Sequence, residues 1–277
     1  QAALHADGVA AWAGQMLRRD AEDSQTDARD EDWAQTLPPI AVEGGEVGGR
    51  IEDMQARFNL NNLVRDGAVS EPDLERFRRL LAALELAPAL ADAVVDWLDE
   101  DIDPRFPGGA EDDAYLGRHP AYRTANAPLA HPAELRRVAG FDAETYAALA
   151  PYVTALPGPT PVNCNTAAAP VLRALADDIG QGEAEAVVER RGDGGFDSVG
   201  DCLAQAAFAG REIPAGTVAV SSRHFLVRAR VRIGGLVGAF FTVLQRGEGG
   251  AARVVARGRG DYDGVPPRPA GAAEGGA

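Results

Sequence analysis

The stretch that decides the fold class is Phe225-Leu226-Val227-Arg228-Ala229-Arg230-Val231-Arg232-Ile233. Apolar residues and arginines alternate along it, which is the period of two expected of a half-buried strand, with the apolar face inward and the arginines outward. Gly234-Gly235 then supplies a two-residue turn, and residues 236–244 are expected to return as a more fully buried strand. Residues 253–257 predict a third strand. The C-terminal part of the chain is therefore expected to form an antiparallel sheet.

The first twenty residues predict a helix. Leu4, Trp12 and Met16 are separated by multiples of four residues, and Val9 lies alongside them, so these side chains share one narrow face. A helix with such a weak apolar stripe would not be stable alone. We therefore expect it to pack on a sheet or to continue a longer helix.

Between residues 20 and 64, a polar segment is followed by segments whose composition is typical of extended strands. Residues 20–32 are almost wholly polar and predict a solvated connector. Residues 37–42 and 47–53 have strand composition and are separated by a glycine pair. The apolar segment 57–63 contains three asparagines, whose side chains we expect to satisfy buried backbone groups.

Residues 70 to about 212 predict a helical block. Ser70-Glu71-Pro72-Asp73 combines an N-cap residue with a proline and acids in the first turn, and apolar residues at helical spacing follow. The order helix, strands, helical block, strands is most simply explained by one α+β unit. In that unit an N-terminal helix packs on an antiparallel sheet, and a large α-helical domain is inserted between the strands. The predicted divisions are 1–66, 67–212, 213–260 and, as a mobile tail, 261–277.

Composition narrows the classes of function. The chain has 277 residues and a formal net charge of −15, and all 27 of its Lys plus Arg residues are arginine. This balance argues against nucleic acid or an anionic membrane surface as the main partner, because both require clustered positive charge. No apolar run reaches the roughly 20 residues needed to span a bilayer.

Residues 92–113 form an acidic stretch, with nine acids and a single arginine. Repulsion among so many carboxylates favours a hard divalent cation, and calcium accepts about six to eight oxygen ligands from flexible loops. The spacing does not match an EF-hand. A solvated acidic loop and a carboxylate pair that performs hydrolysis are the alternatives. The residues predicted to bind calcium are Asp99, Asp101, Asp103, Glu111, Asp113 and Asn126.

Residues 162–196 resemble a helix-hairpin-helix unit, with a capped helix, a turn that contains glycine and a second helix that ends in Arg190-Arg191. Such a hairpin can bind phosphate through the amides of its turn. However, Asp177, Asp178 and Glu183 crowd this turn and would repel phosphate. A structural hairpin is therefore favoured over a nucleic-acid-binding module.

The two cysteines, Cys164 and Cys202, flank most of this hairpin. They lack the spacing of a zinc site, and no histidine lies near either of them in the sequence. A disulfide that closes the unit and a pair of buried thiols both fit this pattern. The four histidines are scattered and give no metal motif.

Several short segments, taken in order, resemble the K-class minor pseudopilins of type II secretion systems. Each is weak alone, but together they cover most of residues 30–210 and form a specific pattern. The segments are Gly49-Arg50-Ile51-Glu52-Asp53 with Arg57-Phe58-Asn59-Leu60-Asn61, Asp96-Trp97-Leu98-Asp99, Gly109-Ala110-Glu111-Asp112, Tyr122-Arg123-Thr124-Ala125-Asn126 and Val162-Asn163-Cys164-Asn165-Thr166-Ala167.

The resemblance implies a pilin-like fold with a large helical insertion, which agrees with the order of elements above. It also implies that the insertion binds calcium through the acidic loop. Members of this class begin with a membrane-spanning helix, so the resemblance implies that Gln1 marks a truncation. The segment would then be the periplasmic part of a bacterial inner-membrane protein.

The implied role is assembly and not catalysis. The resemblance places the chain at the tip of a short periplasmic pseudopilus, in a complex with the I- and J-class minor pseudopilins. The weak, narrow stripe on the N-terminal helix agrees with this role if it packs against partner helices, so Leu4, Val9, Trp12 and Met16 are predicted to bind partners. A calcium-dependent or carboxylate-based periplasmic hydrolase and a nucleic-acid-binding module are the alternatives.

Overall fold

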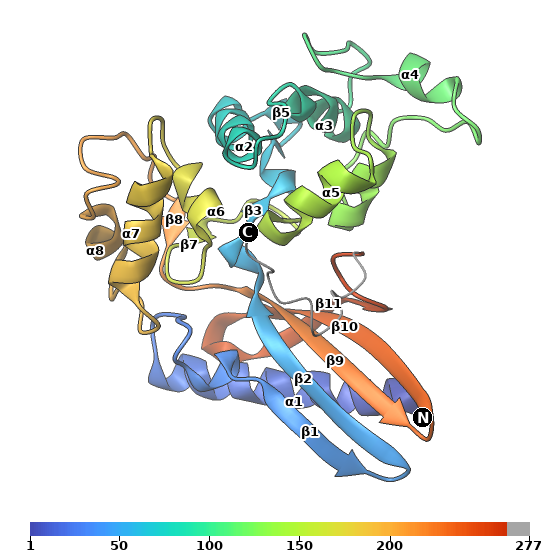
Figure 1. The fold of residues 1–277 in the computed structure, drawn as a ribbon, viewed down its shortest axis with the longest axis vertical. Coiled ribbons are helices and arrows are strands. Elements are labelled where there is room, and N and C mark those ends of the chain that lie inside the picture. The colour runs from blue at the N-terminus through green and yellow to red at the C-terminus, as the bar shows by residue number, and fades with distance from the viewer. Residues whose placement is uncertain (265–277) are drawn as a thin grey trace, which may run out of the picture.

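The computed structural model describes residues 1–264 and has two lobes (Figure 1). We call residues 1–53 and 224–264 the sheet lobe and residues 54–223 the helical lobe. The helices are α1 (Ala2–Asp23), α2 (Glu71–Ala83), α3 (Leu90–Leu98), α4 (Asp112–Leu116), α5 (Ala143–Leu149), α6 (Ala169–Arg173), α7 (Gln181–Arg191) and α8 (Val199–Leu203). The strands are β1 (Leu37–Val42), β2 (Gly45–Asp53), β3 (Phe58–Asn59), β4 (Val64–Arg65), β5 (Ala68–Val69), β6 (Val153–Thr154), β7 (Val162–Asn163), β8 (Val218–Ala219), β9 (His224–Ile233), β10 (Leu236–Arg246) and β11 (Ala252–Arg259).

The main sheet has the order β1-β2-β9-β10-β11, and its neighbouring strands are antiparallel. The pairing of β2 with β9 joins strands that are far apart in sequence, with Ile51 opposite Val227. In the sequence, the whole helical lobe is inserted between these two strands, which are neighbours in the sheet. The predicted α+β fold with a helical insertion is therefore confirmed.

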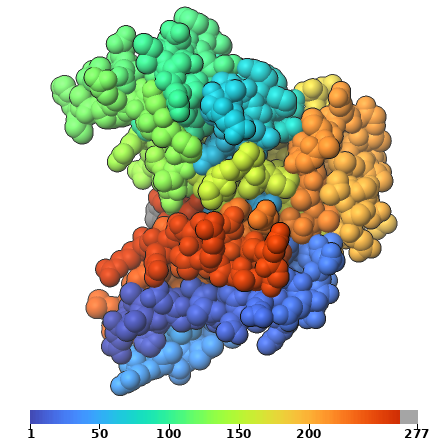
Figure 2. Space-filling view, turned by 180° about the vertical axis from the view of Figure 1, so that it is seen from behind, coloured from blue at the N-terminus to red at the C-terminus, as the bar shows by residue number. Residues whose placement is uncertain are grey.

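The apolar face of the sheet is covered by α1, which runs along the back of the sheet lobe (Figure 2). Ala13 and Leu17 of this helix have no exposed surface and pack in the same core as Phe225 and Val227. Trp33 closes one end of this core with its ring centroid 5.2 Å from that of Phe225. The narrow apolar stripe predicted from the sequence is thus sufficient to hold α1 in place, because the sheet supplies the rest of the apolar surface in this core.

This packing corrects the assignment of the stripe to partner binding. Val9 is 4% exposed and lies in the core between α1 and the sheet. Trp12 and Met16 are partly buried against the same core. Leu4, which is 73% exposed, is the one member of the stripe that projects into solvent. The sheet of the same chain therefore occupies most of the surface that we had assigned to a partner helix.

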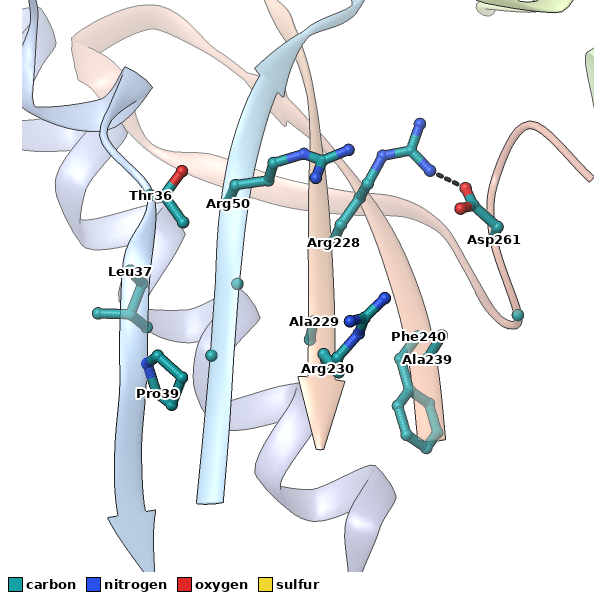
Figure 3. A pocket seen from close by; sticks show the side chains of 13 residues that line it. Thr36, Leu37, Pro39, Arg50, Arg228, Ala229, Arg230, Ala239, Phe240 and Asp261 are labelled. Atoms are coloured by element: carbon teal, nitrogen blue, oxygen red, sulfur yellow. Dashed lines mark hydrogen bonds and ion pairs between the residues drawn. The ribbon is translucent and has the colours of Figure 1, made fainter. Parts of the chain in front are cut away.

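The opposite face of the sheet carries the arginines of β9 and a hollow of about 330 Å³ (Figure 3). Arg228 is not solvated there as predicted, because Glu52, Asp261 and Asp263 surround its guanidinium. The prediction of a tail with few anchors is accordingly wrong for residues 261–264. Tyr262 is 2% exposed and packs in a small core at this face. Residues 265–277 lie outside the described residues.

The β9–β10 hairpin is less buried than its composition indicates. Leu236 and Val237, at the start of β10, are 80% and 59% exposed, whereas Val243 and Leu244 near its end are buried. The prediction of a strand more fully buried than β9 is therefore wrong for the first half of β10. The reason is position, because the tip of this hairpin lies far from the helical lobe (Figure 1).

The helical lobe is larger than the insertion predicted over residues 67–212. Phe58, Leu60 and Leu63 are buried in the same core as Phe77 of α2, and Val218 belongs to that core as well. The predicted boundaries, 67 and 212, follow the helical periodicity of the sequence. The structural boundaries are set by the strands β2 and β9, from which the chain leaves the sheet and to which it returns.

Buried asparagines hold together the loops where the lobe begins. Asn59 donates to the carbonyl of Gly158 at 2.9 Å, and Asn61 donates to those of Leu129 and Leu156 at 3.0 Å. These bonds satisfy backbone groups that have no strand or helix partner. The structural role predicted for these side chains is confirmed.

A buried polar junction joins the two lobes. Asp53, the last residue of β2, accepts hydrogen bonds at its Oδ2 atom from Asn163 (2.9 Å), Thr166 (2.5 Å) and Ser222 (2.7 Å). We call these four residues the lobe junction. Burial raises the pKa of Asp53, and these hydrogen bonds oppose that effect. The junction explains why two polar residues of the segment 162–167 lie in a buried position.

His224, the first residue of β9, gives a testable pH dependence. It is 3% exposed, and neither ring nitrogen has a hydrogen-bond partner among the described residues. Burial, together with Arg223 and Arg253, lowers its pKa to about 4. The unfolded imidazole titrates near pH 6.5, so the stability present above that pH is lost as the pH falls from about 6.5 to about 4.

We expect His224→Leu to remove this contribution. Between pH 7 and pH 5, wild type should lose about 2 kcal/mol of unfolding free energy relative to the variant. Urea unfolding at the two pH values measures this difference, and His119→Leu provides an exposed control. An equal pH response of wild type and His224→Leu would contradict the prediction.

Candidate metal centre

The acidic loop between α3 and α4 is shaped by two aspartates that precede it. Asp92 and Asp96 lie four residues apart on α3 and therefore on one face of the helix. Asp96 accepts the backbone N–H of Arg105 at 3.1 Å, and Asp92 accepts that of Gly108 at 3.2 Å. A Cβ atom on Gly109 would lie 2.2 Å from Asp96 Oδ2, so the glycine permits this close return.

The loop brings together three of the residues predicted to bind calcium. Asp99, Asp101 and Glu111 each place one carboxylate oxygen within 4.8 Å of the others. Asn126, also predicted, lies beside them and donates from Nδ2 to the carbonyl of Asp101 at 3.3 Å. This arrangement gathers oxygen atoms from the end of α3, the loop, the start of α4 and a later segment of the chain.

Several of these oxygen atoms lack a protein partner. Asp99 is 6% exposed and Glu111 is 7% exposed. Neither Asp99 Oδ1 nor Glu111 Oε1 accepts a hydrogen bond from the described residues. Asn126 Oδ1 is buried and without a partner in the same way. Buried acceptors left unsatisfied are costly. Two such oxygens on carboxylates that converge, with a third on the neighbouring Asn126, are the chemistry of a hard-cation site, so these residues fit calcium.

The electrostatics agree with this geometry. Burial raises the pKa of Asp99 to about 7, and the neighbouring charges of Asp101, Asp96 and Glu111 act in the same direction. Burial also raises the pKa of Glu111, although a hydrogen bond from Thr124 opposes it. A bound cation would reverse the direction of both shifts, because it favours the ionised carboxylates.

The structure leaves Asp103 and Asp113 outside this group. Asp103 is exposed, and its backbone N–H donates to Asp101 Oδ1 at 2.9 Å. Asp113 is exposed in the first turn of α4. Glu111 is the N-cap residue of that helix. Asp113 follows two residues later, so its side chain lies on a different face of the helix. The alternation of acids in the sequence could not distinguish these faces.

An aromatic cluster supports the loop from inside the lobe. The rings of Trp97 and Tyr115 meet edge to face with centroids 5.4 Å apart, and Tyr122 stacks on Tyr115 at 5.4 Å. Tyr115 has no exposed surface, and its hydroxyl accepts the N–H of Ala139 at 3.2 Å. The residues that flank the loop are therefore packed inside the lobe, whereas residues 100–103 of the loop itself are exposed.

The hairpin of α6 and α7 has a structural role within the lobe. Arg191, at the end of α7, is 4% exposed and donates to the carbonyls of Cys164 and Ala167 at 2.6 and 2.7 Å. This basic residue thus binds the chain's own backbone. Cys164 and Cys202 are joined by a disulfide that ties α8 to the end of β7.

Sequence reasoning missed a second acidic group. Asp20, Asp27 and Glu31 also lie within 4.8 Å of one another, yet they fall in the segment predicted to be a solvated connector. Asp27 has no exposed surface. The available signal was Trp33 directly after these acids, because a tryptophan that packs in the core draws the preceding residues inward.

Comparison with known proteins shows which family this chain resembles. Two family models described as type II secretion system protein K match residues 56–158 and 162–221. A type II secretion system protein K of Pseudomonas aeruginosa is 40% identical over 271 residues, covering 94% of this chain and 81% of that protein. The chain belongs to the type II secretion system protein K family. A second family member, from Klebsiella pneumoniae, is 37% identical over 251 residues, covering 84% of this chain and 76% of that protein.

The fold of the family is present throughout the described chain. A chain in the crystal structure of the GspK-GspI-GspJ complex from the type 2 secretion system of enterotoxigenic Escherichia coli matches with a TM-score of 0.84 and 24% identity. The match covers 94% of this chain and 96% of that one. Among residues 1–264, no helix combines the length and the hydropathy needed to cross a bilayer.

Proposed function

We propose that this member of the protein K family is a minor pseudopilin that caps the tip of the periplasmic pseudopilus. The observation that carries the proposal is the position of the helical lobe. The N-terminus of α1 lies at one end of the sheet lobe, and the helical lobe lies at the other (Figure 1). If subunits are stacked through α1, the helical lobe covers the free end and leaves no space for a further subunit.

The partners in this proposal are the I- and J-class minor pseudopilins. The protein of similar fold was crystallised in a GspK-GspI-GspJ complex. On the sheet lobe of this chain, Leu4, Leu236 and Val237 are large apolar side chains that are more than half exposed. Leu236 and Val237 are adjacent at the tip of the β9–β10 hairpin, and adjacent exposed apolar side chains are typical of a protein–protein interface. They therefore support assembly through the end that lies far from the helical lobe.

The test is to mix this chain with the soluble I- and J-class proteins of the same organism. Size-exclusion chromatography with light scattering should give a stable complex with one copy of each. Leu236→Ser should weaken that complex about tenfold or more, since burying an exposed leucine contributes about 1.5–3 kcal/mol. Leu116→Ser, at an exposed leucine of the helical lobe, is the matched control. Three separate peaks with the wild-type proteins would contradict the proposed function.

We place the chain in the periplasm, next to an inner-membrane anchor that would precede Gln1. The disulfide between Cys164 and Cys202 supports an oxidising compartment, because such bonds persist outside the reducing cytosol. The role is structural in this proposal, and the acidic loop serves the architecture of the helical lobe and not hydrolysis.

We further propose that the acidic loop binds calcium. Asp99, Asp101 and Glu111 would hold the ion, with the Oδ1 atom of Asn126 as a neutral ligand. The unpartnered oxygens of Asp99, Glu111 and Asn126 support this assignment. A bound ion would fix the end of α3 to the start of α4 and to the segment around residue 126.

Removing two of these carboxylates should abolish calcium binding at this site. We expect Asp99→Asn with Glu111→Gln to lower the affinity of the loop for calcium at least 100-fold, because two charged ligands are lost. Isothermal titration calorimetry should show one binding event fewer than in wild type. At a concentration 100 times the Kd, the ion adds about 2.7 kcal/mol of stability, so the Tm of wild type should rise by about 5 °C or more.

The control for this prediction is Asp113→Asn, which removes an exposed acid of the same stretch and should leave the binding event intact. An unchanged titration in the double variant would contradict the assignment of Asp99 and Glu111 as ligands.

A further inference from the structure

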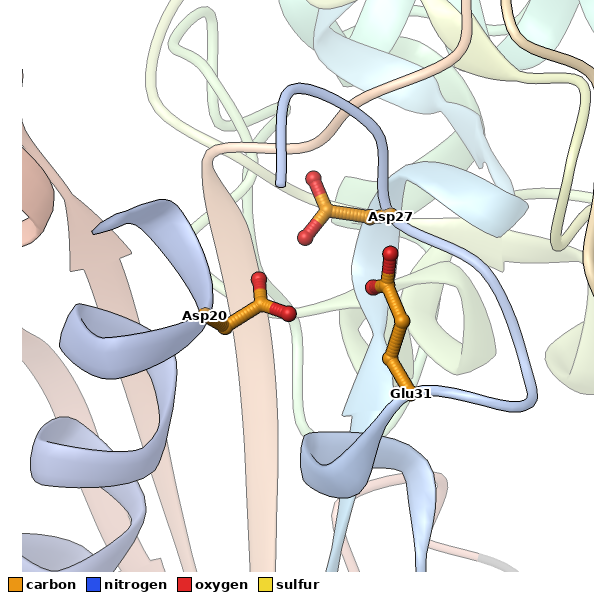
Figure 4. Close-up of side chains that lie close together, drawn as sticks. All are labelled: Asp20, Asp27 and Glu31. Atoms are coloured by element: carbon orange, nitrogen blue, oxygen red, sulfur yellow. The ribbon is translucent and has the colours of Figure 1, made fainter. Parts of the chain in front are cut away.

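The second acidic group lies in the sheet lobe, away from the acidic loop. Asp20 is in the last turn of α1, and Asp27 and Glu31 are in the segment that connects α1 to β1. Figure 4 shows the three carboxyl groups turned toward a common space. One oxygen from each lies within 4.8 Å of the others. We call these three residues the α1-end cluster.

Most of the polar contacts around the α1-end cluster are accounted for. Arg246, at the end of β10, binds Asp20 Oδ2 at 2.8 Å and Asp27 Oδ2 at 2.5 Å. Glu31 accepts from Trp33 Nε1 at 2.6 Å, and it also accepts from Ser24 and the N–H of Ala28. Asp27 Oδ2 additionally accepts the N–H of Ser222 at 2.6 Å. These contacts hold the three carboxyl groups in place.

One oxygen atom remains without a partner. Asp27 has no exposed surface, and its Oδ1 atom accepts no hydrogen bond from the described residues. A fully buried carboxylate oxygen without a donor or a cation is unfavourable. Because Arg246 and Ser222 bind the other oxygen, Oδ1 is available to a ligand shared with Asp20 and Glu31.

The charges around this space do not balance. Three carboxylates face one guanidinium, which leaves two negative charges when all three acids are ionised. A divalent cation would balance the charge and fill the coordination of Asp27 Oδ1.

We propose that Asp20, Asp27 and Glu31 form a second divalent-cation site, separate from the acidic loop. The ligands are all carboxylate oxygens, which suits a hard ion such as calcium. Calcium binds oxygens at about 2.3–2.6 Å, so ligands on opposite sides of the ion stand up to about 5 Å apart. The spacing in the α1-end cluster falls within that limit. Such an ion would tie the end of α1 to the segment that connects α1 to β1.

Terbium luminescence and calorimetry can test this site on the whole chain. The background is the Asp99→Asn and Glu111→Gln variant, in which the acidic loop is disabled. Trp33 Nε1 lies 2.6 Å from Glu31, so it is placed to sensitise terbium in the α1-end cluster. We expect the background variant to retain one binding event for calcium and a sensitised terbium signal that calcium displaces.

Asp20→Asn, added to the background, should lower calcium affinity at least tenfold and remove most of the terbium signal. Glu31→Gln is the second variant, and circular dichroism verifies that each protein is folded. Glu22→Gln is the matched control, because Glu22 is an exposed acid of the same turn that pairs with Arg18. It should leave both readouts unchanged.

Two results would overturn the proposal. One is a background variant that binds no calcium, which would mean that Asp20 and Asp27 satisfy each other with a shared proton. The other is a folded Asp20→Asn variant and a folded Glu31→Gln variant that both bind calcium as the background does. Neither result would depend on whether the chain assembles with the I- and J-class proteins.

Discussion

Asp53→Ala is expected to lower the free energy of unfolding by about 3–5 kcal/mol. The substitution removes the acceptor of the Thr166 and Ser222 hydroxyls and leaves both donors buried, whereas Asn163 keeps other acceptors. Gln55 loses a partner as well, because its N–H donates to Asp53 Oδ1 at 2.8 Å. Three buried donors, on Thr166, Ser222 and Gln55, thus lose their acceptor, and each orphaned buried donor costs about 1–3 kcal/mol.

Urea unfolding followed by circular dichroism measures this change. Asp53→Asn is an informative second variant, because it keeps the volume of the side chain but places an amide against three donors. We expect it to recover only part of the loss. Asp23→Ala, at an exposed acid near the end of α1, is the control and should change stability by less than about 0.5 kcal/mol. A loss below 1 kcal/mol in Asp53→Ala would show that the junction is not a source of stability.

The fold could be predicted from the sequence because its elements follow local rules. The alternation in residues 225–233 specified β9 with its inward and outward faces. Ser70 and Pro72 marked the start of α2, where they occupy the N-cap position and the first turn. The lobe boundaries could not be found in this way. Phe58 and Leu63 belong to the helical lobe by packing, and no local pattern distinguishes the core that an apolar side chain will join.

The candidate metal centre was predicted as a region and only partly as a set of residues. Charge density identified the loop, and Asp99, Asp101 and Glu111 converge there. Asp113 was indistinguishable from Glu111 in sequence because both follow the same glycine pair. Their difference arises from the helix that begins between them. Asp27 was missed for a related reason, since its burial depends on Arg246, a residue more than two hundred positions later.

Breaking the disulfide between Cys164 and Cys202 is expected to lower the free energy of unfolding by about 4 kcal/mol. The two residues are 38 positions apart, and in the chain-entropy model a closed loop of that length restricts the unfolded state by about this amount. Both cysteines have no exposed surface, so the bond lies inside the helical lobe. Urea unfolding of the oxidised and the reduced protein measures the difference. In the Cys164→Ala and Cys202→Ala double variant, reductant should have no effect.

The disulfide should also be coupled to the lobe junction, because Cys164 follows Asn163 directly and the bond restrains the segment that carries it. With the disulfide broken, this segment binds Asp53 less tightly, so Asp53→Ala should cost less in the reduced protein than in the oxidised one. We expect a coupling energy of about 1 kcal/mol from the cycle of oxidised and reduced, wild-type and Asp53→Ala proteins. Additive losses would mean that β7 holds Asn163 in place without help from the disulfide.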